Sequence, residues 1–217
     1  MNKTTALLTS SVGRKIIMSL SGFFLFSFLI IHLYINLFLF KQDNGATFDV
    51  YAEFMATYPL LRPLEIVLFG GFALHAVVGA WLWFTNRSVR PRQYKVNRSS
   101  DSSTLASRVA FWTGTVVAAF LVVHVNTFFI QSRFFPDGRP MYERIAEAFK
   151  HPLYDIFYLI ALGFLGYHLK HGFQSAFQTL GVRDQKYQRL IDIIGIFFWL
   201  IIPMCFAAMP LYFLLAK

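Results

Sequence analysis

The sequence predicts an all-α polytopic membrane protein, a bundle of five transmembrane helices that forms a single domain over residues 1–217. Hydrophobic residues make up 56% of the chain and charged residues only 14%, whereas soluble domains carry about 25% charge. Five long apolar runs stand out, and a run of about 20 apolar residues can cross a bilayer. They cover residues 16–40, 63–84, 109–130, 152–177 and 190–215.

The first run is expected to be a true span. It is longer than the apolar core of a signal peptide, and no small-residue cleavage pattern follows it. Between the spans, residues 42–61 and 131–151 are expected to hold short interfacial helices, because "MYERIAEAFKHPLY" is amphipathic. The loop "NRSVRPRQYKVNRSSDSSTL" is basic and too short to hide a soluble domain. Phosphate-binding loops, nucleophile elbows and patterns for nucleic-acid binding are absent from the sequence, so no nucleic-acid partner is expected.

Charge predicts the orientation of the spans. Lys and Arg gather in the N-terminus, in the loop 85–108 and in the turn 181–189, while the opposite side is acidic or balanced. Basic residues favour the cytoplasmic side, so the N-terminus is expected inside and Lys217 outside. The net charge of +9 is explained by topology alone, although the same basic face would also suit a docking partner.

Histidines occur at two depths within the spans. With a rise of about 1.5 Å per residue, His32 and His124 lie roughly 24 and 22 Å from the inner ends of their spans, and His75 and His168 lie roughly 14 Å from theirs. Ionisable residues in spans are costly and tend to mark function. His151, beside a proline at a membrane edge, is interpreted as an ordinary residue.

Two histidines at one depth on different helices can hold one haem iron from both sides. We therefore expect two b haems, one between His32 and His124 and one between His75 and His168. His171 lies within one turn of His168 and is expected to contact a haem propionate, a quinone or a partner instead. Glycines near the ligands would give the haems flat space, although they also serve helix packing; they are Gly70, Gly71, Gly79, Gly114, Gly163 and Gly172.

Four stretches of the chain carry a resemblance to a known family. They are "SLSGFFLFSFLIIHLYINLF", "LEIVLFGGFALHAVVGAWLWF", "FLVVHVNTFFI" and "YHLKHGFQSAFQTLG", each with one of the four histidines. Over nearly its whole length the chain resembles the cytochrome b membrane-anchor subunit of succinate dehydrogenase and fumarate reductase, in its single-anchor, five-helix, two-haem form.

The resemblance implies specific roles. His32 and His124 would hold the distal haem, and His75 and His168 the proximal haem, His168 being the residue four before Gly172. Ser19 matches a small polar position near the proximal haem, where a role in helix packing is equally compatible.

The resemblance also implies partners. A flavoprotein subunit and an iron–sulfur subunit would perform the carboxylate chemistry, since flavin and cluster motifs are absent from this chain. The chain would anchor them in the bacterial inner membrane, within a complex that forms higher oligomers in some cases. It would carry electrons between the clusters and a membrane quinone, menaquinone for the two-haem type.

Quinone reduction consumes protons, so an ionisable group near the distal haem is expected to help. Glu65 begins the second span on the outer side and is the first candidate, although a glutamate at a span edge is often merely solvated. Tyr58, Lys41 and Asn36 are weaker candidates on the same side.

Three alternative interpretations concern the same histidines. A transporter or proton channel would use the histidines as relays, but would favour acids deep in the spans. Another quinone-linked or ferric-reducing cytochrome b, such as the anchor of a formate dehydrogenase, would share the bis-histidine haems. A membrane di-iron oxidase would need more histidines clustered near one face.

Overall fold

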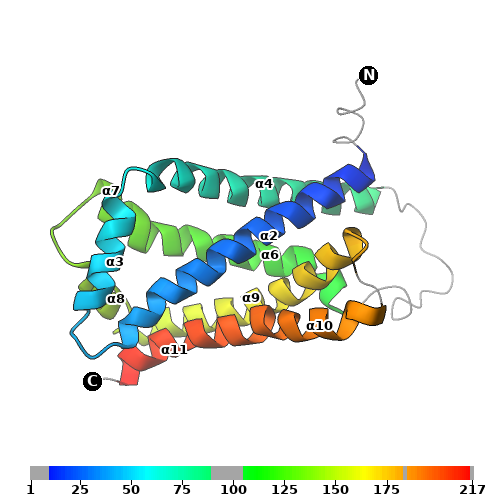
Figure 1. Cartoon of the computed structure of the whole chain (residues 1–217). Coiled ribbons are helices and arrows are strands. Elements are labelled where there is room, and N and C mark those ends of the chain that lie inside the picture. The colour runs from blue at the N-terminus through cyan, green and yellow to red at the C-terminus, as the bar shows by residue number, and fades with distance from the viewer. Residues whose placement is uncertain (1–9, 89–104, 183–184, 216–217) are drawn as a thin grey trace.

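The computed structural model describes residues 10–88, 105–182 and 185–215, and every regular element in these ranges is a helix (Figure 1). Five helices are long and apolar enough to cross a membrane, as the sequence predicts. They are Ser11–Phe40, Leu61–Asn86, Val109–Phe134, Pro152–Thr179 and Lys186–Leu215. The all-α fold with five candidate spans is therefore confirmed.

The first span consists of α2 (Ser11–Asn36) and a 3-10 turn, η1 (Leu37–Phe40). The Ser10 side chain caps α2, because its hydroxyl accepts a hydrogen bond from the Gly13 amide at 3.0 Å. Such a cap satisfies one of the free amides at a helix start. The expected interfacial helix after this span is α3 (Ala46–Thr57).

The second and third spans are α4 (Leu61–Ser88) and α6 (Leu105–His124). The third span continues through a π-helical turn, η2 (Val125–Ile130), into α7 (Gln131–Phe134). The amphipathic segment predicted next is α8 (Met141–Ala148). The N-terminal residues 1–9 and much of the predicted basic loop, residues 89–104, lie outside the described residues.

The fourth span is α9 (Pro152–Thr179), and Pro152 stands at its first turn, where a missing amide proton costs nothing. The fifth span is α10 (Gln185–Ile196), a π-helical turn η3 (Phe197–Ile201) and α11 (Ile202–Leu215).

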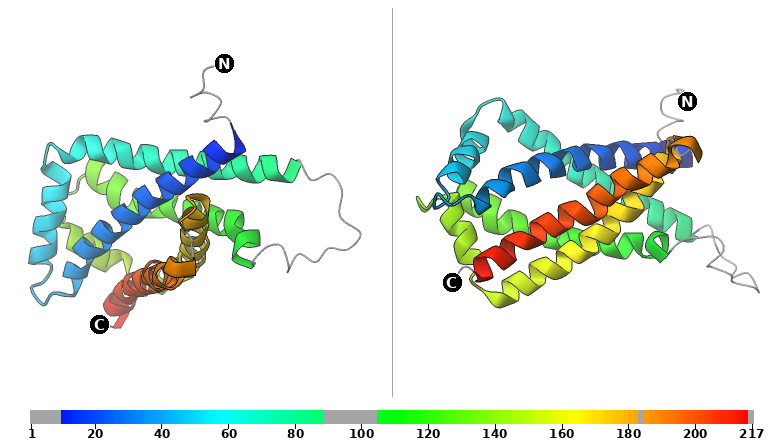
Figure 2. Two further views of the ribbon diagram at one scale, coloured as in Figure 1. Left: turned by 45° about the vertical axis from the view of Figure 1, so that its right-hand side comes forward. Right: turned by 60° about the horizontal axis from the view of Figure 1, so that its bottom comes forward.

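Helix α9 packs against α6, α2 and the η3–α11 stretch, while α4 packs mainly against α2. Figure 2 shows α11 running alongside α9. Gly166 lets α9 approach the backbone of η3 closely, because a Cβ at this position would lie 2.8 Å from the carbonyl oxygen of Trp199. Phe26, Phe173 and Ile191 form part of a buried cluster between α2, α9 and α10.

One end of the bundle carries α3 and α8, and we call it the α3–α8 end (Figure 1). The two short helices are joined there, because the Tyr142 amide donates to the Asp49 carboxylate at 2.8 Å. Gly45 has a φ of +82°, and a Cβ there would lie 2.1 Å from the Tyr142 ring. Only glycine suits this position, since it combines a left-handed backbone with a close contact.

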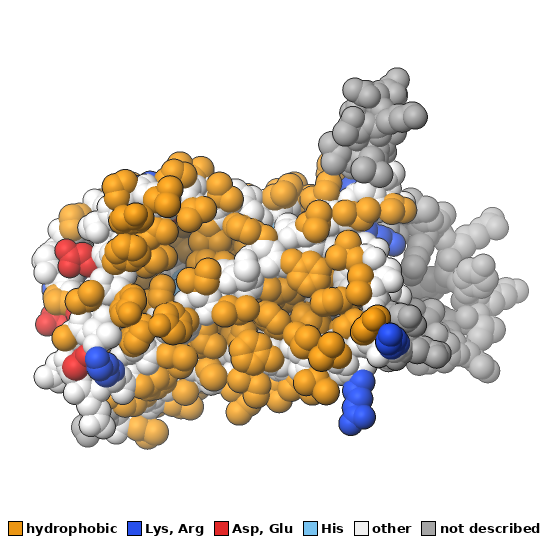
Figure 3. All heavy atoms as spheres, viewed as in Figure 1, with side chains coloured by type: hydrophobic (Ala, Val, Ile, Leu, Met, Phe, Trp, Pro, Cys, Tyr) orange, Lys and Arg blue, Asp and Glu red, His pale blue; other side chains and the backbone are white. Residues whose placement is uncertain are grey.

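The surface between the two ends is apolar. Large hydrophobic side chains such as Ile66, Val122 and Leu153 are 74%, 70% and 83% exposed. Figure 3 shows such side chains covering the middle of one face, with charged groups at its two ends. This apolar belt is far beyond the patches of soluble monomers and is consistent with a multi-pass membrane protein. Which end of the bundle faces the cytoplasm stays a prediction.

Candidate functional site

The structure brings four of the five span histidines together as two pairs. His32 of α2 and His124 of α6 have ring centroids 5.8 Å apart, with ring planes at 87°. His75 of α4 and His168 of α9 have ring centroids 6.1 Å apart, with ring planes at 79°. These are the same two pairs that equal depth predicts from the sequence.

The two pairs lie at different levels along the bundle. Ser21 contacts His75 and precedes His32 by 32 − 21 = 11 residues on α2, so the levels differ by about 16 Å along this helix. A Cβ on Gly114 would contact His168, and Gly114 precedes His124 by 124 − 114 = 10 residues on α6, which gives about 15 Å. Two helices thus place the pairs at the same separation.

The spacing within each pair suits a shared metal ion. Two metal–imidazole bonds of about 2.0–2.1 Å, with the half-width of one ring added on each side, would separate the two centroids by roughly 6 Å. Both pairs have this separation. Among the described residues no group of three or more His, Cys, Asp and Glu is gathered around a point, but a haem iron needs only two protein ligands.

A serine hydroxyl lies beside His75. The Ser21 hydroxyl lies 3.1 Å from the Met18 carbonyl oxygen and 3.1 Å from Nδ1 of His75. A hydroxyl has one proton and two lone pairs, so with its proton directed to Met18 it can accept a hydrogen bond from Nδ1 of His75. That arrangement leaves the lone pair of Nε2 free, as a metal ligand requires.

Two tyrosines adjoin His124. Nδ1 of His124 lies 3.0 Å from the Tyr158 hydroxyl, and the Tyr154 hydroxyl lies 3.0 Å from that of Tyr158. Hydroxyl protons rotate to suit their neighbours, so this chain can run in either direction. Asn36 lies 3.5 Å from Nδ1 of His32 and donates to the His32 carbonyl at 2.8 Å. The longer contact does not fix which nitrogen of His32 carries the proton.

The surroundings of His168 differ from those of His75. Its Nδ1 is buried and has no hydrogen-bond partner among the described residues. A Cβ on Gly114 would lie 3.1 Å from its Cε1, and a Cβ on Gly22 would lie 3.7 Å from Cε1 of His75. The two glycines therefore let neighbouring helices approach both rings of this pair closely.

The other predicted glycines differ in their surroundings. Gly71 faces Phe24 and Gly79 faces Met18, so these two serve helix packing, whereas a Cβ at Gly70, Gly163 or Gly172 would meet nothing within 4 Å. Gly22, which does face a ligand ring, was not among the glycines expected from the sequence.

Ser19 and His171 are the other residues predicted near the His75–His168 pair. Ser19 is buried, but its hydroxyl donates to the Lys15 carbonyl at 2.9 Å, and Ser21 is the serine beside His75. His171 is half-buried one turn beyond His168, and none of the described contacts joins it to His75.

The residues predicted to help quinone reduction each contact a neighbour that is close in the sequence. Glu65 accepts a hydrogen bond from Arg62 at 2.9 Å within the first turns of α4. Lys41 donates to Thr47 at 2.6 Å, and the exposed Tyr58 stacks on Phe54. Of the four residues named at this end, only Asn36 lies beside a paired histidine. Sequence reasoning missed Ser21 and Tyr158, which differ from other span residues only in the direction they face.

No protein-family model matches the chain, and no curated protein or solved structure matches it either.

Proposed function

We propose that the chain is the dihaem cytochrome b anchor of a succinate:quinone oxidoreductase, carrying electrons between an iron–sulfur subunit and membrane quinone. The observation that carries this proposal is the pair of histidine pairs, each with ring centroids about 6 Å apart. Each pair joins two helices, as bis-histidine haem sites in helix bundles do.

The stacking of the pairs supports a path across the bundle. Their separation of about 15–16 Å along α2 and α6 places one site towards each end of the spans. Haem bound at both sites would supply one-electron transfer along this path.

The chain's own residues would tune and orient the ligands. With His75 bound to iron through Nε2, its Nδ1 would donate to the Ser21 hydroxyl, 3.1 Å away, and a hydrogen bond of this kind orients the ring and raises its basicity as a ligand. Tyr158 would do the same for His124. Phe28 stacks on His32 with centroids 5.3 Å apart and limits its rotation.

The narrower assignment rests on the resemblance of the four histidine motifs to the succinate dehydrogenase and fumarate reductase anchors. It adds the flavoprotein and iron–sulfur partners, menaquinone as the quinone, and a bacterial inner membrane with the N-terminus in the cytoplasm. The anchor of another quinone-linked dehydrogenase would share the histidine geometry, and the co-purifying subunits separate the two assignments.

A haem count tests the proposal. The full chain, purified in detergent with whatever subunits accompany it, should show two low-spin b haems per chain in a pyridine haemochrome assay. His75→Ala and His124→Ala should each leave one haem, and His151→Ala, a matched change outside the pairs, should leave two. A folded complex without haem would refute the proposal and favour a histidine relay for transport.

A further inference from the structure

A groove at the α3–α8 end carries an inference that goes beyond the proposed function and does not depend on haem. The groove has a volume of about 740 Å³, within the range of roughly 300–1,000 Å³ typical of small-molecule sites. One wall comes from the third span, a second from residues 139–151, which include α8, and a third from the start of α9.

The groove crosses the expected edge of the membrane. Val123, Leu153 and Phe157 line it, and these apolar side chains are exposed and lie within spans. Arg139 and Glu147 also line it, but they lie outside the spans. An occupant would therefore have an apolar part among lipid-facing side chains and a charged part at the boundary, as a phospholipid does.

An exposed amide lies within the third span. Asn126 lines the groove and is 134 − 126 = 8 residues from the end of this span at Phe134. No hydrogen bond to its side chain is found among the described residues. Because a polar group without a partner is costly in hydrocarbon, this amide indicates that a hydrogen-bonding group of the bilayer reaches it. The ester carbonyls of a phospholipid lie just below its headgroup and can accept such a bond.

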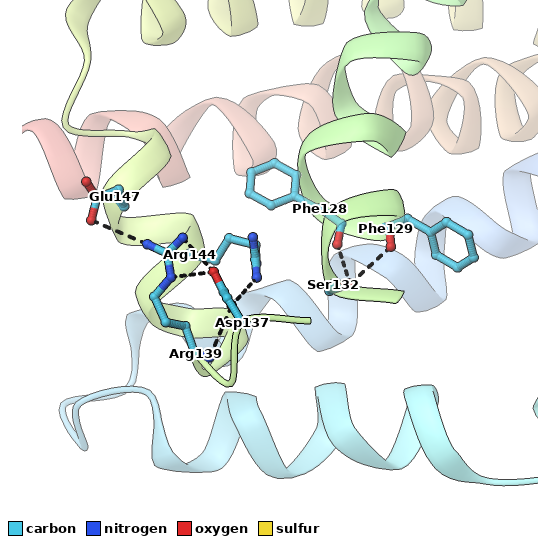
Figure 4. A network of polar contacts seen from close by, with 7 residues as sticks. All are labelled: Phe128, Phe129, Ser132, Asp137, Arg139, Arg144 and Glu147. Atoms are coloured by element: carbon cyan, nitrogen blue, oxygen red, sulfur yellow. Dashed lines mark hydrogen bonds and ion pairs between the residues drawn. The ribbon is translucent and has the colours of Figure 1, made fainter. Parts of the chain in front are cut away.

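Charged side chains gather at the rim of the groove (Figure 4). Asp137 accepts hydrogen bonds from Arg139 at 2.7 Å and from Arg144 at 2.6 Å. Nη1 of Arg139 lies 4.0 Å from Oε2 of Glu147, which is beyond hydrogen-bonding distance. The Arg139 and Glu147 side chains are 49% and 62% exposed, so a cation and an anion lie next to each other and both are open to a ligand.

The balance of charge at the rim selects the headgroup. The formal charges of the two arginines, Arg139 and Arg144, are cancelled by those of Asp137 and Glu147, so an anionic lipid would meet no excess of positive charge. A zwitterionic headgroup can place its phosphate on Arg139 and its cation on Glu147. An ethanolamine ammonium can donate a charge-assisted hydrogen bond to that carboxylate, whereas a choline group has no N–H to donate.

We propose that this groove binds phosphatidylethanolamine, with the phosphate on Arg139, the ammonium group on Glu147 and an ester carbonyl accepting a hydrogen bond from Asn126. The acyl chains follow Val123 and Phe157 into the bilayer. A lipid held in this way joins the α8 segment to the third and fourth spans, because its contacts come from all three walls.

Photolabelling locates the site. The purified complex would be placed in phosphatidylcholine vesicles that contain a small share of phosphatidylethanolamine with a diazirine in its acyl chain, and the labelled peptides mapped. We expect label on residues 123–131 or 147–157, and its loss when unlabelled phosphatidylethanolamine is added. Equal label on all five spans would identify bulk lipid and overturn the proposal. Label that phosphatidylglycerol or naphthoquinone removes, and that phosphatidylethanolamine does not, would overturn it as well.

A matched pair of variants tests the choice of headgroup. The measured quantity is the label from phosphatidylethanolamine divided by the label from phosphatidylcholine with the same diazirine chain. Glu147→Gln keeps the size of an exposed side chain and removes its charge, and should lower this ratio about fivefold. Glu143→Gln, the same change on α8 outside the walls of the groove, should leave the ratio unchanged. Equal ratios for Glu147→Gln and the unaltered protein would refute the assignment of the headgroup.

Haem is counted on the same samples, so that the two proposals fail separately. A full haem content without selective labelling of the groove refutes the lipid site and leaves the cytochrome assignment standing. A folded complex without haem that still shows the selective label refutes the cytochrome assignment and supports the lipid site.

Discussion

Replacement of Ser21 by alanine should raise the reduction potential of one haem and leave the other unchanged. When His75 binds iron through Nε2, its Nδ1 carries the ring proton and donates to the Ser21 hydroxyl, 3.1 Å away, which makes this ring a stronger electron donor to iron. A stronger donor stabilises the ferric state. Ser21→Ala removes the acceptor, destabilises the ferric state and therefore raises the potential.

The size of the shift follows from the strength of one hydrogen bond. Such a bond contributes about 1 kcal/mol net, and a one-electron couple shifts by about 59 mV for each tenfold change in equilibrium. Since a tenfold change is about 1.4 kcal/mol, complete loss of the bond in the ferric state alone would give about 40 mV. We expect an upward shift of roughly 20–40 mV, because the ferrous state keeps part of the bond's strength.

Redox titration followed by absorbance of the b haems measures both potentials. Ser19→Ala is the matched control, since Ser19 is also buried and also donates to a carbonyl of its own helix. Tyr158→Phe should move the other haem. The reasoning fails if Ser19→Ala shifts a potential as much as Ser21→Ala does, or if Ser21→Ala and Tyr158→Phe move the same haem.

Three further predictions concern single positions. His168→Ala should lose one haem per chain in the pyridine assay, whereas His171→Ala should keep two; loss of a haem from the second variant alone would reverse the assignment. Gly166→Ala places a methyl group against a backbone carbonyl of η3 and should lower the unfolding free energy by about 1–3 kcal/mol, while Gly163→Ala, which meets nothing within 4 Å, should not lower it; thermal unfolding in detergent compares them. The Arg139 guanidinium holds the pKa of the Asp137 carboxyl below its ordinary value. The contribution of Asp137 to the stability of the α8 segment is therefore complete above about pH 3.9 and is lost as pH falls through the lower folded pKa. Hydrogen exchange of α8 should show this loss in the unaltered protein and not in Asp137→Asn.

The depth of each histidine was predictable because the rise of a helix is constant. Counting residues from the span ends gave two levels, and the same two pairs meet in the structure. The predicted levels are roughly 8–10 Å apart, whereas α2 and α6 separate the pairs by about 15–16 Å. Errors at the span ends therefore changed the separation of the levels but not the pairing. The helices α2 and α4 extend beyond the predicted spans, because hydrogen bonding does not stop where the apolar run stops.

The direction of a side chain around its helix was harder to predict. Ser19 and Ser21 are two residues apart, so they face directions about 200° apart around α2. Both are buried, and a sequence alone does not say which of two buried faces meets α4. The π-helical turn η2 adds a further uncertainty, because it rotates every residue after His124 relative to a regular helix.

Contacts between distant segments explain the other misses. The approach of Tyr158 to His124 depends on how α9 crosses α6, and no local sequence pattern gives that crossing. Glu65 shows the opposite case, since Arg62 is only three residues away and the pair at this spacing was available from the sequence.

The interlocked order of the pairs has a consequence for biogenesis. The first span pairs with the third and the second with the fourth, so each site joins helices that are not neighbours in the chain. During synthesis the His32–His124 site is complete once the third span has been inserted, whereas the His75–His168 site must wait for the fourth. If the pairs bind haem as proposed, a chain truncated after residue 151 and released into the membrane should acquire one haem and not the other. The fifth span carries none of the paired histidines, so it joins a bundle in which both pairs can already have formed.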